Sequence, residues 1–116
     1  MVTNFLKYIE TRLAIIKYDL SKYKRYSNLL KIILKTKSRK ILEIGVYKGL
    51  RSLEMIKAAK SVNKNVVFYG FDMFEKFFEK KNILQVELSK KPQSLNVINN
   101  LLKEHADVKL IKGNTL

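Results

Sequence analysis

The sequence has no cysteine and only one histidine, His105. Disulfide bonds and thiolate chemistry are therefore excluded, and so are zinc sites built from cysteine and histidine. We expect the chain itself to hold no metal. A protein without cysteine suits the reducing cytoplasm, which is where we expect it to act.

Long apolar runs are also missing from the sequence. No run approaches the roughly 20 residues that a helix needs to span a bilayer. Near the N-terminus, Lys7 and Glu10 interrupt the apolar residues, so we expect neither a signal peptide nor a transmembrane segment. The chain has 116 residues, one proline and four glycines, which predicts a single domain without a Pro/Gly-rich linker.

Acidic residues are scarce, because 24 Lys/Arg stand against 10 Asp/Glu and give a net charge of +14. The imbalance is greatest in residues 1–40, which hold 11 cations and 2 acids. One function that this charge suggests is a non-catalytic basic module that binds RNA or an anionic membrane surface. Nucleic-acid binding is not favoured, because lysine dominates as in AT-rich coding sequences and no recognised motif is present. Rings and cations nevertheless alternate as in single-strand binders, at Tyr18, Lys22, Tyr23, Lys24, Arg25 and Tyr26.

Residues 1–36 are expected to form two amphipathic helices that cover one side of the rest of the chain. The second helix is predicted at residues 27–35, with Ser27 as its N-cap. In residues 4–20, apolar side chains recur at spacings of four and three and predict the first helix: Phe5, Ile9, Leu13, Ile16 and Leu20.

Residues 37–116 are expected to form an α/β domain. Residues 40–46 are predicted to form a strand buried on both faces, because the run after Lys40 contains no charged residue except Glu43. Two further strands and two helices alternate after it, so the sheet should be a Rossmann-like one of three parallel strands in the order 3-2-1. Their expected places are 49–60 for the first helix, 66–71 for a strand, 94–104 for the second helix and 108–112 for a strand.

The turn after the first strand carries two glycines in the sequence Glu-Ile-Gly-Val-Tyr-Lys-Gly, residues 43–49. Gly45 allows a sharp turn with a ligand directly against the backbone, and Gly49 opens the next helix. Tyr47 occupies the second glycine position of a dinucleotide fingerprint, which disfavours a nicotinamide oxidoreductase. Asp72, at the end of the next strand, can accept hydrogen bonds from both hydroxyls of a ribose. The pattern therefore indicates a ligand with a nucleoside but without a phosphate chain.

These motifs resemble the cofactor-binding half of class I S-adenosylmethionine-dependent methyltransferases. The stretches EIGVYKG, YGFDMFE and IKGNTL are most similar to those of macrocin-type O-methyltransferases, which act on sugars and antibiotics. The resemblance covers residues 30–116. It implies an S-adenosylmethionine cofactor and methyl transfer to a hydroxyl of a sugar or another small molecule.

The resemblance also implies roles for single residues in holding the cofactor. Glu43, Gly45 and Gly49 would shape its methionine and ribose side, and Ser52 would reach the methionine carboxylate. Asp72 would bind the ribose hydroxyls. The adenine would meet the residues at the ends of the second and third strands: Met73, Phe74, Gly113 and Asn114. Asn114 departs from the family, in which many members carry aspartate at this position, although its carbonyl can still accept a hydrogen bond.

Each of these assignments also has a purely structural interpretation. On this interpretation Glu43 is a strand-end acid paired with a lysine, and the two glycines serve tight packing alone. Phe77 and Phe78, together with Phe74, are more typical of a core or of a partner-facing patch than of an adenine site.

A complete fold of the resembled class has about seven strands, whereas this sequence predicts three. In that family the acidic Mg²⁺ ligands and the general base come from the fourth strand onward. No catalytic residue can be assigned here, and we expect the chain to be a fragment of a longer enzyme or to self-associate. The strand that begins at Ile41 and ends at Val46 would lie at the edge of the sheet, where its unpaired backbone favours a homo-oligomer.

Overall fold

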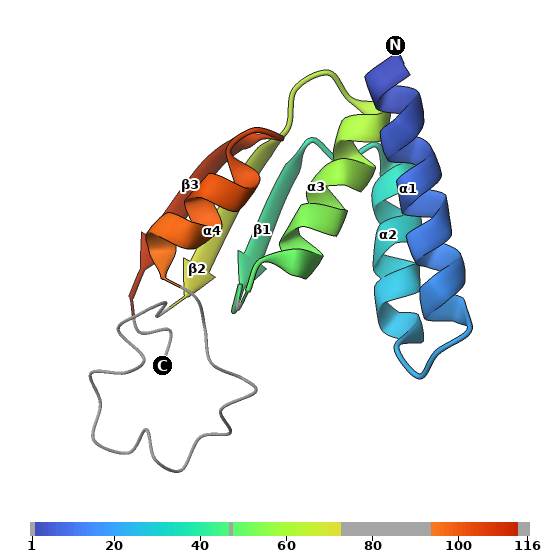
Figure 1. The fold of residues 1–116 in the computed structure, drawn as a ribbon, viewed down its shortest axis with the longest axis horizontal. Coiled ribbons are helices and arrows are strands. Elements are labelled where there is room, and N and C mark those ends of the chain that lie inside the picture. The colour runs from blue at the N-terminus through green and yellow to red at the C-terminus, as the bar shows by residue number, and fades with distance from the viewer. Residues whose placement is uncertain (1, 47, 73–93, 114–116) are drawn as a thin grey trace.

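The computed structural model describes residues 2–46, 48–72 and 94–113. The described elements follow the expected order of two helices and then alternating strands and helices (Figure 1). They are α1 (Val2–Asp19), α2 (Lys24–Thr36), β1 (Lys40–Ile44), α3 (Leu50–Val62), β2 (Val67–Asp72), α4 (Leu95–Leu102) and β3 (Asp107–Lys112).

The three strands form one parallel sheet in the order β1-β2-β3, so the predicted 3-2-1 arrangement is confirmed. Ile44 lies opposite Phe71, and Phe71 lies opposite Ile111. The carboxyl ends of all three strands therefore meet at one end of the sheet. Both α3 and α4 lie on one face of the sheet, the face toward the viewer in Figure 1.

In the described part of the chain, one hydrophobic core joins the sheet to the helices α1 to α4. At its centre Ile56, Phe68, Ile98 and Leu102 are completely buried. The helices α1 and α2 pack on α3 and add further side chains to the same cluster: Ile15, Tyr18, Leu30 and Ile33. The division of the chain at residues 1–36 and 37–116 stays a prediction.

The expectation that β1 is buried on both faces is wrong. Ile41 is only 8% exposed, but Leu42 and Ile44 on the other face are 62% and 67% exposed. Helices cover the first face, and no described helix packs on the second. An unbroken apolar run does not distinguish a strand covered on both faces from one covered on a single face.

The predicted helix at residues 4–20 is present as α1, but its predicted apolar stripe faces outward. Leu13 and Leu20 are 60% and 85% exposed, while the opposite side of the helix packs on α3. Thr11, Ile15 and Tyr18 are the buried residues of that side. Apolar residues occur on both sides of α1, so spacing alone could not choose between them.

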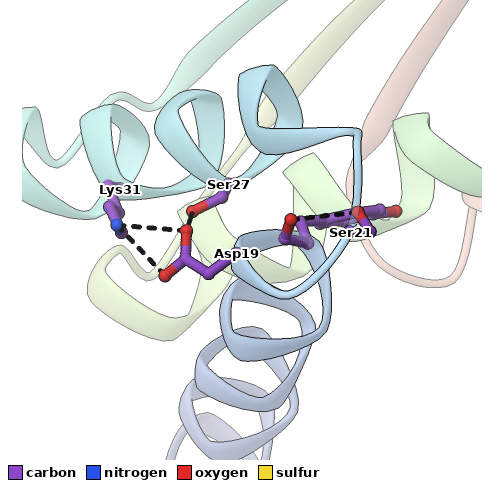
Figure 2. Close-up of polar contacts among 5 residues, drawn as sticks. Asp19, Ser21, Ser27 and Lys31 are labelled. Carbon is purple, nitrogen blue, oxygen red and sulfur yellow. Dashed lines mark hydrogen bonds and ion pairs between the residues drawn. The ribbon is translucent and has the colours of Figure 1, made fainter.

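The second helix begins three residues before the predicted start, and Ser27 is not its N-cap. Tyr23 occupies the cap position, without a side-chain capping bond. Ser27 is completely buried inside α2, and its hydroxyl donates to Asp19 Oδ1, which also receives Lys31 (Figure 2). These contacts tie the end of α1 to the first two turns of α2. The hydrogen bond from Ser27 is the main reason that the pKa of Asp19 lies below its ordinary value.

No helix in the described ranges is both long and apolar enough to cross a membrane. The aromatic segment with Phe74, Phe77 and Phe78 lies outside the described residues.

Candidate functional site

The end of β1 turns sharply at Gly45. Its φ angle is +86°, a left-handed conformation that glycine adopts without strain, and its N–H donates to the Phe71 carbonyl at 2.8 Å. Among the described residues, a Cβ atom added at Gly45 would have no neighbour within 4 Å. The glycine therefore leaves open space beside the backbone, which a ligand can approach directly.

Asp72 lies against this glycine turn. The N–H of Val46 donates to Asp72 Oδ2 at 2.6 Å, across 26 positions in the sequence. The structure thus brings Gly45 and Asp72 together at the ends of two neighbouring strands, as the sequence predicted. A carboxylate offers about four acceptor positions, which suits the binding of hydroxyl groups.

Glu43 and Ser52 form a second pair next to this turn. Ser52 is completely buried in α3, and its hydroxyl donates to Glu43 Oε1. Burial raises the pKa of Glu43, and the negative charge of Asp72 raises it further, while the Ser52 hydrogen bond and Arg51 act in the opposite direction. Ser52 therefore orients Glu43 in this structure. Its predicted contact with a methionine carboxylate stays a prediction.

Gly49 differs from Gly45 in its surroundings. It is buried with a φ angle of +80°, directly before α3. A Cβ atom added there would lie 3.2 Å from Ile98 Cδ1 and 3.2 Å from Leu101 Cδ2, both on α4. The packing interpretation thus has direct support at Gly49 but not at Gly45. The proximity of α4 could not be read from local spacing, because 49 positions separate Gly49 from Ile98.

The end of β3 completes the row of strand ends. The N–H of Gly113 donates to the backbone carbonyl of Asp72 at 2.9 Å, and a Cβ atom at Gly113 would meet no other described residue within 4 Å. Met73, Phe74 and Asn114 belong to the predicted adenine side of the site but lie outside the described residues, as does Tyr47.

Sequence reasoning missed a cavity of about 460 Å³ between the end of α1 and the first turn of α3. Inside it, Tyr18 donates a hydrogen bond to Glu54, and burial together with this carboxylate raises the pKa of Tyr18 to about 12. Arg51 stacks on the ring of Tyr26, with 3.8 Å between its central carbon and the ring centroid. The pairing joins residues 25 positions apart, so no local motif signals it. The lining residues are Lys17, Tyr18, Tyr23, Leu50, Arg51, Leu53 and Glu54.

No protein-family model matches the sequence, and no curated protein matches it. A solved structure similar to this chain is the SAH-bound methyltransferase PaMTH1 of Podospora anserina, at 18% identity and a TM-score of 0.44. The match covers 97% of this chain and 42% of PaMTH1, so the chain spans less than half the length of that protein.

We call the group of Gly45, Val46, Asp72 and Gly113 the strand-end site. It combines an uncovered stretch of backbone with a carboxylate fixed beside it. These two features suit a ligand that lies flat on the turn and offers vicinal hydroxyls to Asp72. A Cβ atom at position 45 would occupy part of that open space, so glycine keeps the backbone of the turn accessible.

Proposed function

We propose that the strand-end site binds S-adenosylmethionine and that the protein is a methyltransferase. The observation that supports this most is the hydrogen bond from Val46 N–H to Asp72, which sets the ribose-binding acid beside the open glycine turn. The order of the three motifs in the sequence supports it independently. When bound, this cofactor supplies a methyl group on a sulfonium, which a nucleophilic oxygen can accept.

The residues of this chain hold and orient the cofactor. Asp72 accepts hydrogen bonds from the ribose hydroxyls, and the backbone at Gly45 forms the surface against which the ligand lies. Ser52 holds Glu43 in place beside them. Alignment of the methyl group with its acceptor is the main requirement of methyl transfer, so fixing the donor is the contribution of this half of the site.

The acceptor is the finer part of the proposal. Similarity to macrocin-type enzymes supports a hydroxyl of a sugar or another small molecule. The same similarity supports a requirement for Mg²⁺ in a complete enzyme, with ligands supplied from outside the three strands, and the cysteine-free sequence supports a cytoplasmic location. The macrocin-like specificity and the requirement for Mg²⁺ stay predictions.

Calorimetry with S-adenosylhomocysteine tests the proposed cofactor. We expect the full chain to bind it, and Asp72→Ala to weaken binding by roughly tenfold to a hundredfold, since hydrogen bonds to a charged group contribute about 1.5–3 kcal/mol. Asp107→Ala is the matched control, because Asp107 is an exposed aspartate at the opposite end of the same sheet. Equal losses in the two variants, or no binding by the folded chain, would reject the proposal.

The alternative function, a basic module that binds RNA, predicts a different pattern. Binding to a single-stranded RNA would then fall steeply with salt and would not change in Asp72→Ala. The uneven charge of residues 1–40 favours this alternative, whereas the geometry around Asp72 contributes nothing to it.

A further inference from the structure

The outward side of α1 carries a continuous apolar surface. Leu6, Leu13 and Ile16 are 53%, 60% and 52% exposed, and Leu20, just beyond the helix, is 85% exposed. Spacings of three and four residues place them on one side of a helix, opposite the side that packs on α3. We call this surface the α1 stripe, and its residues are Phe5, Leu6, Ile9, Leu13, Ile16 and Leu20.

An exposed surface of this kind needs an explanation. Single exposed apolar side chains are ordinary, but a contiguous row of six along one helix marks an interaction surface. In Figure 1, α1 lies at the outer edge of the molecule, with α2 and α3 on its inner side. The α1 stripe is therefore accessible to a large flat partner.

Positive charge borders the α1 stripe on both sides. At 100° per residue, Arg12 and Lys17 fall on opposite flanks of the row, and both are exposed. The cations Lys22, Lys24 and Arg25 follow at the end that carries Leu20, where Lys22 lies 5.4 Å from the centroid of the Tyr23 ring.

The acids of this region do not offset that charge. Residues 1–40 contain two of them, Glu10 and Asp19. Glu10 pairs with Lys57 at 2.8 Å, and Asp19 pairs with Lys31 at 3.3 Å. Both acids are thus neutralised within the molecule, and the surface around the α1 stripe keeps its positive charge.

We propose that the α1 stripe docks on an anionic lipid surface, with α1 lying in the plane of the interface. An apolar row flanked by lysine and arginine is the arrangement by which helices bind membrane surfaces, because the side chains enter the acyl boundary while the cations meet lipid headgroups. This partner accounts for both features at once. A second copy would bring two positively charged flanks together, and RNA would leave the apolar row uncovered.

Vesicle co-sedimentation of the full chain tests this proposal. We expect strong binding to vesicles of equal parts phosphatidylcholine and phosphatidylglycerol, and at least tenfold weaker binding to phosphatidylcholine alone. Arg12→Gln should lower the partition coefficient about fivefold, because a cation near an anionic surface contributes about that factor. Lys109→Gln removes the same charge from the exposed part of β3 and is the control for net charge.

The apolar part of the proposal needs its own variants. Leu13→Gln combined with Ile16→Gln should reduce vesicle binding at least tenfold without loss of folding, since both side chains are exposed. Val97→Gln, at a 52% exposed valine on α4, should leave binding unchanged. Because the chain has no tryptophan, Ile16→Trp gives a single fluorescent reporter that should shift to the blue on anionic vesicles, while Val97→Trp should not.

Three results would overturn the proposal. The first is a folded chain that does not bind anionic vesicles. The second is vesicle binding that depends on salt alone and is equal in the stripe variant and in the Val97→Gln control. The third is a chain that binds no vesicles and sediments as a dimer, while its variant with Leu13→Gln and Ile16→Gln sediments as a monomer. That result would assign the α1 stripe to a second copy of the chain.

Discussion

At the scale of single residues, the two glycines of the turn have different surroundings and so different expected roles. Both have positive φ angles, of +86° at Gly45 and +80° at Gly49. Of the two, Gly49 alone has described residues close to where a Cβ atom would stand. Gly45 faces open space, and Gly49 faces α4.

Alanine substitution at the two glycines should therefore affect stability and ligand affinity in opposite order. Gly49→Ala should lower the free energy of unfolding more than Gly45→Ala does, because left-handed strain costs roughly 1–2 kcal/mol at both sites and overpacking against Ile98 and Leu101 adds about 1–3 kcal/mol. Gly45→Ala should have the larger effect on S-adenosylhomocysteine affinity. Urea denaturation and calorimetry measure the two effects, and the reverse ranking in both would contradict these roles.

Glu43 should make the stability of the fold depend on pH. Its pKa in the folded protein lies above the ordinary value of 4.5, mainly because of burial. The folded state thus holds its proton more tightly than the unfolded chain does. The stabilisation is fully present below pH 4.5 and is lost as the pH rises through the raised pKa.

Replacing Glu43 by glutamine should remove that dependence. The difference in the free energy of unfolding between the parent chain and Glu43→Gln should then become less favourable to the parent as the pH rises. Glu104→Gln, at an exposed carboxylate, controls for the loss of one acid. Urea titrations at a series of pH values measure the difference, and a trend in the other direction would show that Glu43 is stabilised as an anion.

At the scale of elements, the α1–α2 hairpin depends on polar contacts as well as apolar packing. Ser27 and Lys31 on α2 both reach Asp19 at the end of α1 (Figure 2). Ser21, in the turn between the helices, donates to the Tyr18 carbonyl at 3.0 Å and accepts from the Tyr23 N–H at 3.0 Å.

Ser27→Ala should raise the pKa of Asp19 toward its ordinary value of 3.8, because the hydrogen bond from Ser27 is the main cause of the lowered value. The lowered pKa stabilises the fold above pH 3.8 and ceases to do so as the pH falls through it, so the variant should unfold at a higher pH in an acid titration. Carboxyl NMR shifts report the pKa directly. Ser21→Ala is the control, and an unchanged Asp19 in Ser27→Ala would contradict the assignment.

The sequence predicted where the helices and strands lie, but not which of their faces are buried. Apolar spacing located α1, α3 and α4, and the strands were found to within about two residues, because these signals are local. The side of α1 that is buried depends on α3, and the open face of β1 depends on which helices cover the sheet. Those contacts join distant parts of the chain, and no local pattern encodes them.

The candidate site divides in the same way. Gly45 and Asp72 were predicted to contact the same nucleoside, and the structure confirms that they lie close together. Neither the hydrogen bond from Val46 N–H to Asp72 nor the one from Ser52 to Glu43 could be predicted, since each depends on the path of the backbone through the turn. The stacking of Arg51 on Tyr26 could not be predicted either, because no local sequence motif signals it.

At the scale of the whole molecule, β1 is an edge strand that pairs with β2 on one side. In the described part of the chain no other strand pairs with it. Its side chains Leu42 and Ile44 are largely exposed. Self-association through this edge stays a prediction, and the net charge of +14 opposes it.

Sedimentation velocity tests the edge prediction. We expect association that increases with protein concentration and with salt, because salt screens the repulsion between positively charged copies. Leu42→Lys should abolish it, since a charge on an exposed edge strand prevents pairing. A monomer at every concentration and salt level would contradict the prediction, and an equal effect of Leu13→Gln would assign the contact to α1.

The central claim is that Gly45, Val46 and Asp72 form one surface that holds an adenosyl group. NMR titration of the ¹⁵N-labelled chain with S-adenosylhomocysteine tests it most directly, because the Val46 amide reports on its bond to Asp72. We predict that the amides of Gly45, Val46 and Gly113 shift together and saturably, while those at the opposite end of the sheet do not move. Saturable binding that leaves these three amides unchanged would contradict the account.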